Sequence, residues 1–174
     1  ITFPSVSASL SGTILKSDGT AFAVDGLYTN LQISINADNI STQQNVGADG
    51  SYSVSLSPGT YHFNAEYSSW QPSTQESVNF EYNIEDFVVT GDTTNNISLP
   101  TITLSGTVTD PSGQPVSAAR IEFNSDCCPE YRTSANVKTD ANGAYSVKML
   151  AIDEWSYFSV YPPEGNTDLI AFAL

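Results

Sequence analysis

The sequence predicts an all-β protein built from two tandem β-sandwich domains, and four observations lead to that prediction. Apolar and polar residues alternate along short segments such as 51–56 and 145–149, and a period of two is the signature of a strand with one buried face. Turn-forming Asp, Asn and Gly separate these segments. No window keeps a 3.6-residue apolar period, and residues 81–89 and 153–156 have room for a single helical turn at most.

The fourth observation is an internal repeat. Leu10-Ser11-Gly12-Thr13 returns as Leu104-Ser105-Gly106-Thr107, and the Asp49-Gly50 turn before one alternating segment returns as Asn142-Gly143 before another. The register holds over five expected strands, which indicates duplication of a whole sandwich unit rather than of one hairpin.

The repeat predicts a first domain over residues 1–100 and a second over residues 101–174. Ile97-Ser98-Leu99-Pro100 precedes the second copy as Ile1-Thr2-Phe3-Pro4 precedes the first, so residues 1–6 resemble the tail of an earlier repeat. The second copy has no counterpart of residues 83–99, and we expect it to lack its C-terminal strand or strands. A segment of a longer array would then carry an unpaired edge unless a neighbour covers it.

Charge and composition narrow the classes of function. Nineteen Asp and Glu against five Lys and Arg give a net charge of −14, which disfavours binding to nucleic acid and to anionic membranes. No apolar run approaches the length of a membrane span, and the first residues lack the pattern of a signal peptide. A polar surface of Ser, Thr and Asn suits an exported fragment, and we expect an extracellular or cell-surface location.

The two cysteines, Cys127 and Cys128, are adjacent. Adjacent cysteines close no long loop, so a bridge between them gains little from restricting the unfolded chain. The sequence leaves three alternatives open: two free thiols, a vicinal disulfide in an oxidising compartment, or a bridge to another chain.

Three motifs of the second half resemble a known family. Residues 104–116 (LSGTVTDPSGQPV), 119–123 (ARIEF) and 139–147 (TDANGAYSV) are similar to the carboxypeptidase regulatory-like domain. The resemblance implies a transthyretin-like (prealbumin-like) β-sandwich and an accessory role in secreted enzymes or surface proteins, often in tandem. It implies no catalytic residues. The first half matches less closely, since residues 20–29 look like an insertion.

The residues themselves indicate no enzyme. His62 is the only histidine and alternates outward from its apolar neighbours, as a solvated strand residue does. No nucleophile elbow, zinc-binding helix motif or phosphate-binding glycine loop occurs.

Calcium and polysaccharide are the two classes of ligand for which the sequence offers candidate residues. Carboxylate and amide oxygens from loops suit Ca²⁺, although each Asp can instead bond the backbone of its own turn. Exposed tryptophans can stack on sugar rings, although each can instead cap the end of a core. The calcium candidates are Asp18, Asp49, Asp110, Asp140 and Asn142, and the stacking candidates are Trp70 and Trp155.

Together these patterns favour non-catalytic repeats that space, display or support other domains of the same polypeptide. The alternatives are a carbohydrate-binding module and calcium-stiffened adhesin repeats. Partners would then include a polysaccharide or a surface protein.

Overall fold

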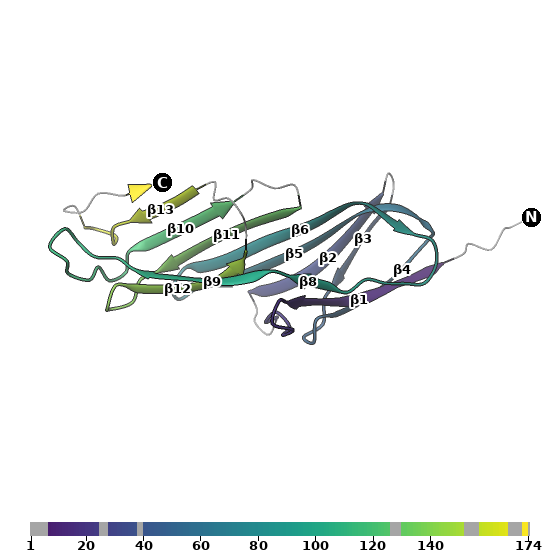
Figure 1. The fold of residues 1–174 in the computed structure, drawn as a ribbon, viewed down its shortest axis with the longest axis horizontal. Helices are drawn as coiled ribbons and strands as arrows, with labels where there is room; N and C mark the ends of the chain where they lie inside the picture. Colours follow the sequence, from purple (N-terminus) through teal and green to yellow (C-terminus); the bar gives the residue numbers. More distant parts are fainter. Residues whose placement is uncertain are drawn as a thin grey trace, which may run out of the picture. The chain divides into compact units, whose positions relative to one another are not determined.

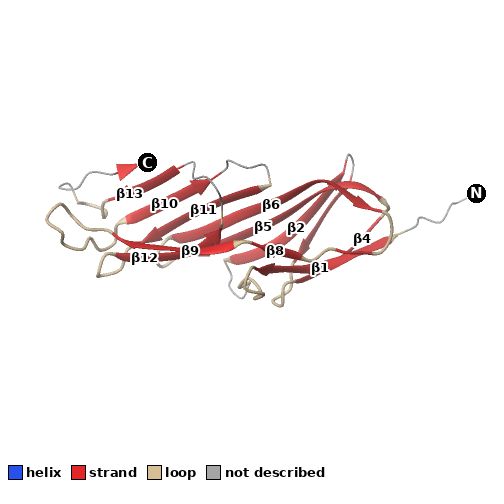
Figure 2. Ribbon diagram, viewed as in Figure 1, coloured by secondary structure: helices blue, strands red, loops and turns tan. Residues whose placement is uncertain are grey.

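The computed structural model describes residues 7–24, 28–37, 40–125, 130–151, 157–166 and 172–173. Throughout these residues the chain forms strands and loops with no helix (Figures 1 and 2). The predicted all-β class is therefore confirmed. The chain divides into two compact units, one of residues 1–67 with 81–100 and the other of residues 68–80 with 101–174.

The first unit has two sheets. In one, β1 pairs antiparallel with β4 and parallel with β7 and β8. In the other, the strand order is β3-β2-β5-β6. The strands are β1 (Ala8–Lys16), β2 (Thr29–Ala37), β3 (Ile40–Asn45), β4 (Ser51–Leu56), the start of β5 (Gly59–Gln71), the end of β6 (Glu76–Val89), β7 (Thr93–Thr94) and β8 (Ile97–Leu99).

The core of the first unit follows from the alternation in the sequence. On β4, Tyr52, Val54 and Leu56 are buried while the serines between them are exposed. Strands β2, β5 and β8 contribute further buried residues in the same period of two, because successive side chains of a strand point to opposite faces. These further residues are Leu31, Ile33, Ile35, Tyr61, Phe63, Ala65, Ile97 and Leu99.

Strand β6 changes face at Asp86. That residue has a φ of 52°, a left-handed conformation that is uncommon for residues other than glycine and that fits a bulge. Beyond it Phe87 packs against Phe63, with ring centroids 5.6 Å apart, and Val89 is buried. Val88 between them is 57% exposed. The stretch in which the sequence allowed a helical turn is therefore strand.

The second unit repeats this plan. Strand β12 pairs with β9, and the other sheet runs β14-β13-β10-β11, as β6-β5-β2-β3 runs in the first unit. Among the described residues, β9 has no counterpart of β7 or β8 beside it. The strands are β9 (Thr101–Thr107), β10 (Arg120–Ser125), β11 (Tyr131–Lys138), β12 (Ala144–Leu150), β13 (Tyr157–Tyr161) and β14 (Phe172–Ala173).

Residues 68–80, at the tip of the β5–β6 hairpin, belong to the second unit. Within that unit Val78 packs against a buried core of Ile121, Phe123, Ala135, Val137, Val147 and Met149. The sequence-based boundary between residues 100 and 101 left this hairpin with the first domain. The tip instead continues the second unit's sheet beyond β11.

Candidate functional site

The turn after β9 is closed by Asp110. One carboxylate oxygen, Oδ1, accepts hydrogen bonds from the backbone N–H groups of Ser112 and Gln114, both at 2.9 Å, and from the Ser112 hydroxyl at 2.7 Å. A short acidic side chain that bonds the backbone two residues on is an Asx turn. Asp110 therefore holds its own loop.

The other candidate acids do the same. Asp18 Oδ1 accepts from the N–H and hydroxyl of Thr20, and Asp49 Oδ1 accepts from the N–H and hydroxyl of Ser51 at 3.0 and 2.6 Å. Asp140 Oδ1 accepts from the N–H groups of Asn142 and Ala144 at 2.8 and 2.9 Å. The alternative that the sequence left open, turn closure by each Asp, describes all four carboxylates.

These hydrogen bonds also lower the pKa values of two of the carboxyl groups. The hydroxyl of Ser112 holds the pKa of Asp110 below its ordinary value, and the hydroxyl of Ser51 does the same to the pKa of Asp49. In both cases a donor stabilises the charged form. The described part of the chain gathers no group of three or more His, Cys, Asp or Glu side chains that could hold a metal ion. The calcium site stays a prediction.

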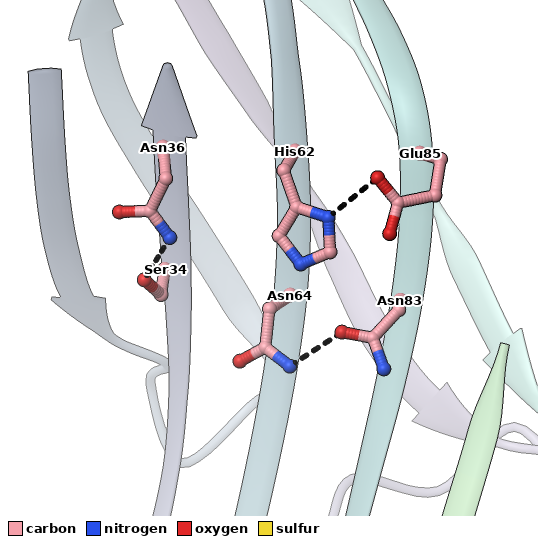
Figure 3. A network of polar contacts seen from close by, with 6 residues as sticks. All are labelled: Ser34, Asn36, His62, Asn64, Asn83 and Glu85. Atoms are coloured by element: carbon pink, nitrogen blue, oxygen red, sulfur yellow. Dashed lines mark hydrogen bonds and ion pairs between the residues drawn. The ribbon is translucent and has the colours of Figure 1, made fainter. Parts of the chain in front are cut away.

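His62 lies on a polar face of the first unit (Figure 3). Its Nδ1 is 3.0 Å from Glu85 Oε2 on the neighbouring strand, and below it Asn64 donates to Asn83 at 2.9 Å. The nearest hydroxyl drawn there, that of Ser34, accepts from Asn36 at 2.9 Å and does not meet the imidazole. These are cross-strand pairs that stabilise a sheet, and they lack the nucleophile–base arrangement of a hydrolase.

Trp70 lies within strand β5, next to its last residue. Its side chain is 42% exposed, so it does not cap a closed core. Trp155, Cys127 and Cys128 fall outside the described residues, so stacking by Trp155 and the three alternatives for the cysteines stay predictions.

Two tyrosines on β13 form a pair that was not among the candidate site residues predicted from the sequence. The hydroxyls of Tyr157 and Tyr161 are 2.5 Å apart, and the Arg120 guanidinium lies 4.3 Å from the Tyr161 ring centroid. The bond with Tyr157 raises the pKa of Tyr161. The signal was present in the sequence, because both tyrosines alternate with Phe158 and Val160, which pack against the core.

No described helix has the length and hydropathy needed to cross a membrane. No family model matches the chain, and no curated protein matches it. The resemblance to the carboxypeptidase regulatory-like domain therefore stays a prediction.

Three solved structures are similar to this chain at low identity. A candidate adhesin from Bacteroides ovatus is 9% identical, with 99% of this chain and 83% of that chain covered and a TM-score of 0.43. A DUF3823 family protein from Parabacteroides merdae is 15% identical, with 90% of each chain covered and a TM-score of 0.35. The Bacillus anthracis TIE protein is 16% identical with a TM-score of 0.34; the match covers 97% of this chain but 31% of that longer one. At these scores none carries an argument about this protein.

Proposed function

We propose that this chain is a run of non-catalytic β-sandwich repeats in a larger extracellular or surface protein, where it spaces, displays or supports other domains. The finer assignment to transthyretin-like modules of the carboxypeptidase regulatory-like type is part of the same proposal. The observation that carries it is that residues 68–80, which continue strands of the first repeat, belong to the second compact unit.

The hairpin tip has specific contacts inside the second unit. The Thr133 hydroxyl donates to the Asn79 carbonyl at 3.2 Å, and the Lys138 N–H donates to Glu76 Oε1 at 3.2 Å. Val78 adds apolar contact with the core. The hairpin therefore completes the edge at β11, which a repeat folding alone would leave unpaired.

The chain consequently passes between the units three times, after residues 67, 80 and 100. Domains that are joined by one linker unfold independently, whereas units that share a hairpin lose contacts in both when one unfolds. Such coupling suits repeats that keep a spacing, and the net charge of −14 keeps a long array soluble.

Unfolding measured by tryptophan fluorescence tests the coupling, because both tryptophans fall in the second unit. Ile33 in the first unit is fully buried, so Ile33→Ala should cost about 2–5 kcal/mol. We expect the fluorescence transition in urea to move to lower concentration together with the circular dichroism signal. Ser53→Ala, which changes an exposed residue of β4 in the same unit, is the control. A fluorescence transition that stays in place in Ile33→Ala would show that the units are independent.

The exposure of Trp70 supports a second candidate, binding of a neutral polysaccharide. A half-exposed indole on a sheet offers a flat surface for a sugar ring, and the negative charge argues against acidic glycans. The test is a fluorescence titration of Trp155→Phe, which leaves Trp70 as the single reporter, with a panel of neutral glycans. Saturable change in that variant and its absence in Trp70→Phe support binding, and no change with any glycan excludes it.

A further inference from the structure

The second unit carries a regular grid of polar and aromatic side chains on the outward face of one sheet. Strands β11, β10 and β13 pair side by side in that sheet (Figure 1). Residues that alternate with the core residues of each strand share the outward face. In order from β11 through β10 to β13, the three rows of the grid are Lys138, Arg120 and Tyr161; Asn136, Glu122 and Ser159; and Ser134, Asn124 and Tyr157.

The middle row contains two buried polar atoms that have no hydrogen-bond partner among the described residues. They are Asn136 Oδ1 and Ser159 Oγ, one on each side of Glu122. Ser159 is 1% exposed although it faces outward. A polar group that is buried without a partner costs free energy, and native proteins keep few of them. A ligand that brings hydroxyl groups to this row would supply the missing hydrogen bonds.

Two tyrosines close over Ser159. They lie two residues before it and two residues after it on the same face of β13, and the hydroxyls of Tyr157 and Tyr161 are 2.5 Å apart. The bond with Tyr157 raises the pKa of Tyr161, and the nearby Ser159 hydroxyl counters part of that rise. Ser159 nevertheless makes no hydrogen bond of its own. A ligand that took over the bond between the tyrosine hydroxyls would also uncover Ser159.

The charges at the centre of the grid cancel. Arg120 and Glu122 form an ion pair, and their side chains are 42% and 27% exposed. Both groups can therefore still be reached from solvent. A guanidinium donates hydrogen bonds and a carboxylate accepts them, so the pair matches the two capacities of a sugar hydroxyl. Since each charge already has its opposite beside it, a neutral ligand with many hydroxyl groups suits the pair.

The tip of the β5–β6 hairpin extends this face beyond β11. The side chain of Asn79 on β6 donates to Ser134 Oγ of the grid at 3.4 Å, so Asn79 lies on the outward face. Val78 beside it packs against the core of the unit. The hairpin tip and the grid both belong to the second unit, and together they form one continuous outward face.

Trp70 lies on this face as well. Asn64 on β5 donates to Asn83 on β6 across the hairpin. An even number of residues separates Trp70 from Asn64 and Asn79 from Asn83, so Trp70 and Asn79 share a face. The Trp70 side chain is 42% exposed. Four strand spacings, about 19 Å, separate β5 from β13. The indole and the tyrosine pair therefore lie at opposite ends of one polar surface.

We propose that this face binds a neutral polysaccharide that runs across the strands, from Trp70 to the tyrosines of β13. The indole stacks on one sugar ring. Glu122 and Asn136 accept hydrogen bonds from hydroxyl groups of rings further along, and the tyrosine hydroxyls separate to bond the last ring. The net charge of −14 disfavours an acidic polysaccharide. The inference rests on the second function proposed above, binding through Trp70, and names the rest of that site.

Calorimetric titration of the full chain with linear oligosaccharides tests this site. The probes are oligomers of cellulose, mannan and xylan, each from disaccharide to hexasaccharide, and oligogalacturonate is the acidic comparison. The variants are Trp70→Ala, Glu122→Gln and Ser159→Ala. Glu66→Gln is the matched control for Glu122→Gln, because it removes the same charge from an exposed strand residue of the first unit. Urea unfolding of each variant measures whether the fold is retained.

We expect the affinity for one neutral series to rise with chain length, because only a long oligomer reaches both ends of the face. Trp70→Ala and Glu122→Gln should each weaken binding of the longest member about tenfold or more, and Glu66→Gln should leave it unchanged. Ser159→Ala should weaken binding about threefold or more. Its urea midpoint should equal or exceed that of the unaltered chain, because the substitution removes a buried hydroxyl that has no partner.

Four results would overturn the inference. Binding that depends on Trp70 but neither on oligomer length nor on Glu122 and Ser159 would confine the site to the indole, and the second proposed function would stand. Equal losses in Glu122→Gln and Glu66→Gln would show that the carboxylate acts through charge alone. Tighter binding of oligogalacturonate than of every neutral series would contradict a neutral ligand. No binding of any probe would remove the second proposed function as well. The coupled unfolding that tests the first proposed function is independent of all four results.

Discussion

The two copies of one glycine offer a matched test of the difference between β1 and β9. A Cβ added at Gly12 would lie 1.8 Å from the Asn95 carbonyl oxygen, which is backbone of the segment between β7 and β8. At Gly106 the three nearest atoms all belong to the Tyr145 side chain, at 2.8 to 2.9 Å. A side chain can turn aside, whereas the backbone at Asn95 can only move away from β1.

The magnitude follows from what that movement uncovers. Ile97 and Leu99 are 7% and 0% exposed, and re-exposing two such side chains costs about 3–6 kcal/mol. Loss of the bond from Tyr52 to the Asn95 carbonyl adds about 1 kcal/mol. A loss of about 4–7 kcal/mol is a large share of the stability of a domain, about 5–15 kcal/mol. Gly106→Ala removes a flexible residue from a strand, which offsets the displacement of one ring, so we expect a change below about 1 kcal/mol.

Urea unfolding of Gly12→Ala and Gly106→Ala, followed by circular dichroism, measures both costs under the same conditions. We expect Gly12→Ala to lose part or all of its strand signal before urea is added, and Gly106→Ala to keep the midpoint of the unaltered chain. Equal midpoints for the two variants would refute the reasoning, because the argument requires a covered edge at β1 and an open one at β9.

Three further predictions follow from single contacts. Thr139 is buried, donates to the Val116 carbonyl and accepts from the Ala119 N–H, so Thr139→Val should cost about 2–4 kcal/mol in urea unfolding by leaving two buried groups unpaired. The lowered pKa values of Asp49 and Asp110 contribute stability above the ordinary carboxyl pKa, which is lost as the pH falls through the folded values; the melting temperature of Asp110→Asn should therefore depend less on pH in acid. Because turn bonds hold one oxygen of each of these carboxylates and the described residues gather no group of three candidate ligands, calcium should leave the melting temperature unchanged, and a rise that a chelator reverses would instead support the calcium site.

Local periodicity predicted those parts of the fold in which the interacting residues lie close together in the sequence. The alternating pattern of β4 and β12 marks a buried face, and the Asp-Gly turn before β4 carries its own hydrogen bonds. These features depend on residues within a few positions of one another, so a sequence displays them directly. Turn closure by Asp49 and Asp110 could be predicted as one alternative for the same reason, because its hydrogen bonds join residues two to four positions apart.

The tip of the β5–β6 hairpin could not be predicted from local periodicity. Apolar alternation on β5 stops at Tyr67, and a polar stretch with Pro72 follows, so the local pattern beyond Tyr67 does not predict a strand. The strand continues to Gln71 because its tip belongs to the second unit, where Val78 meets a core built from residues more than forty positions later. The second half of β6 could not be predicted for a different reason. The bulge at Asp86 shifts the alternation by one residue, so the strand has no regular period of two in the sequence.

Edge strands β3 and β9 of the described sheets differ in the kind of side chain that they leave uncovered. Strand β3 ends its sheet, but residues 41–45 are Ser, Thr, Gln, Gln and Asn, mostly exposed. A polar edge of this kind is stable in water and discourages pairing. The edge at β9 instead leaves Ile102 37% exposed and Leu104 half-buried, so closing it gains apolar burial as well as hydrogen bonds. A strand added at β9 therefore completes a core, whereas one added at β3 would gain main-chain bonds alone.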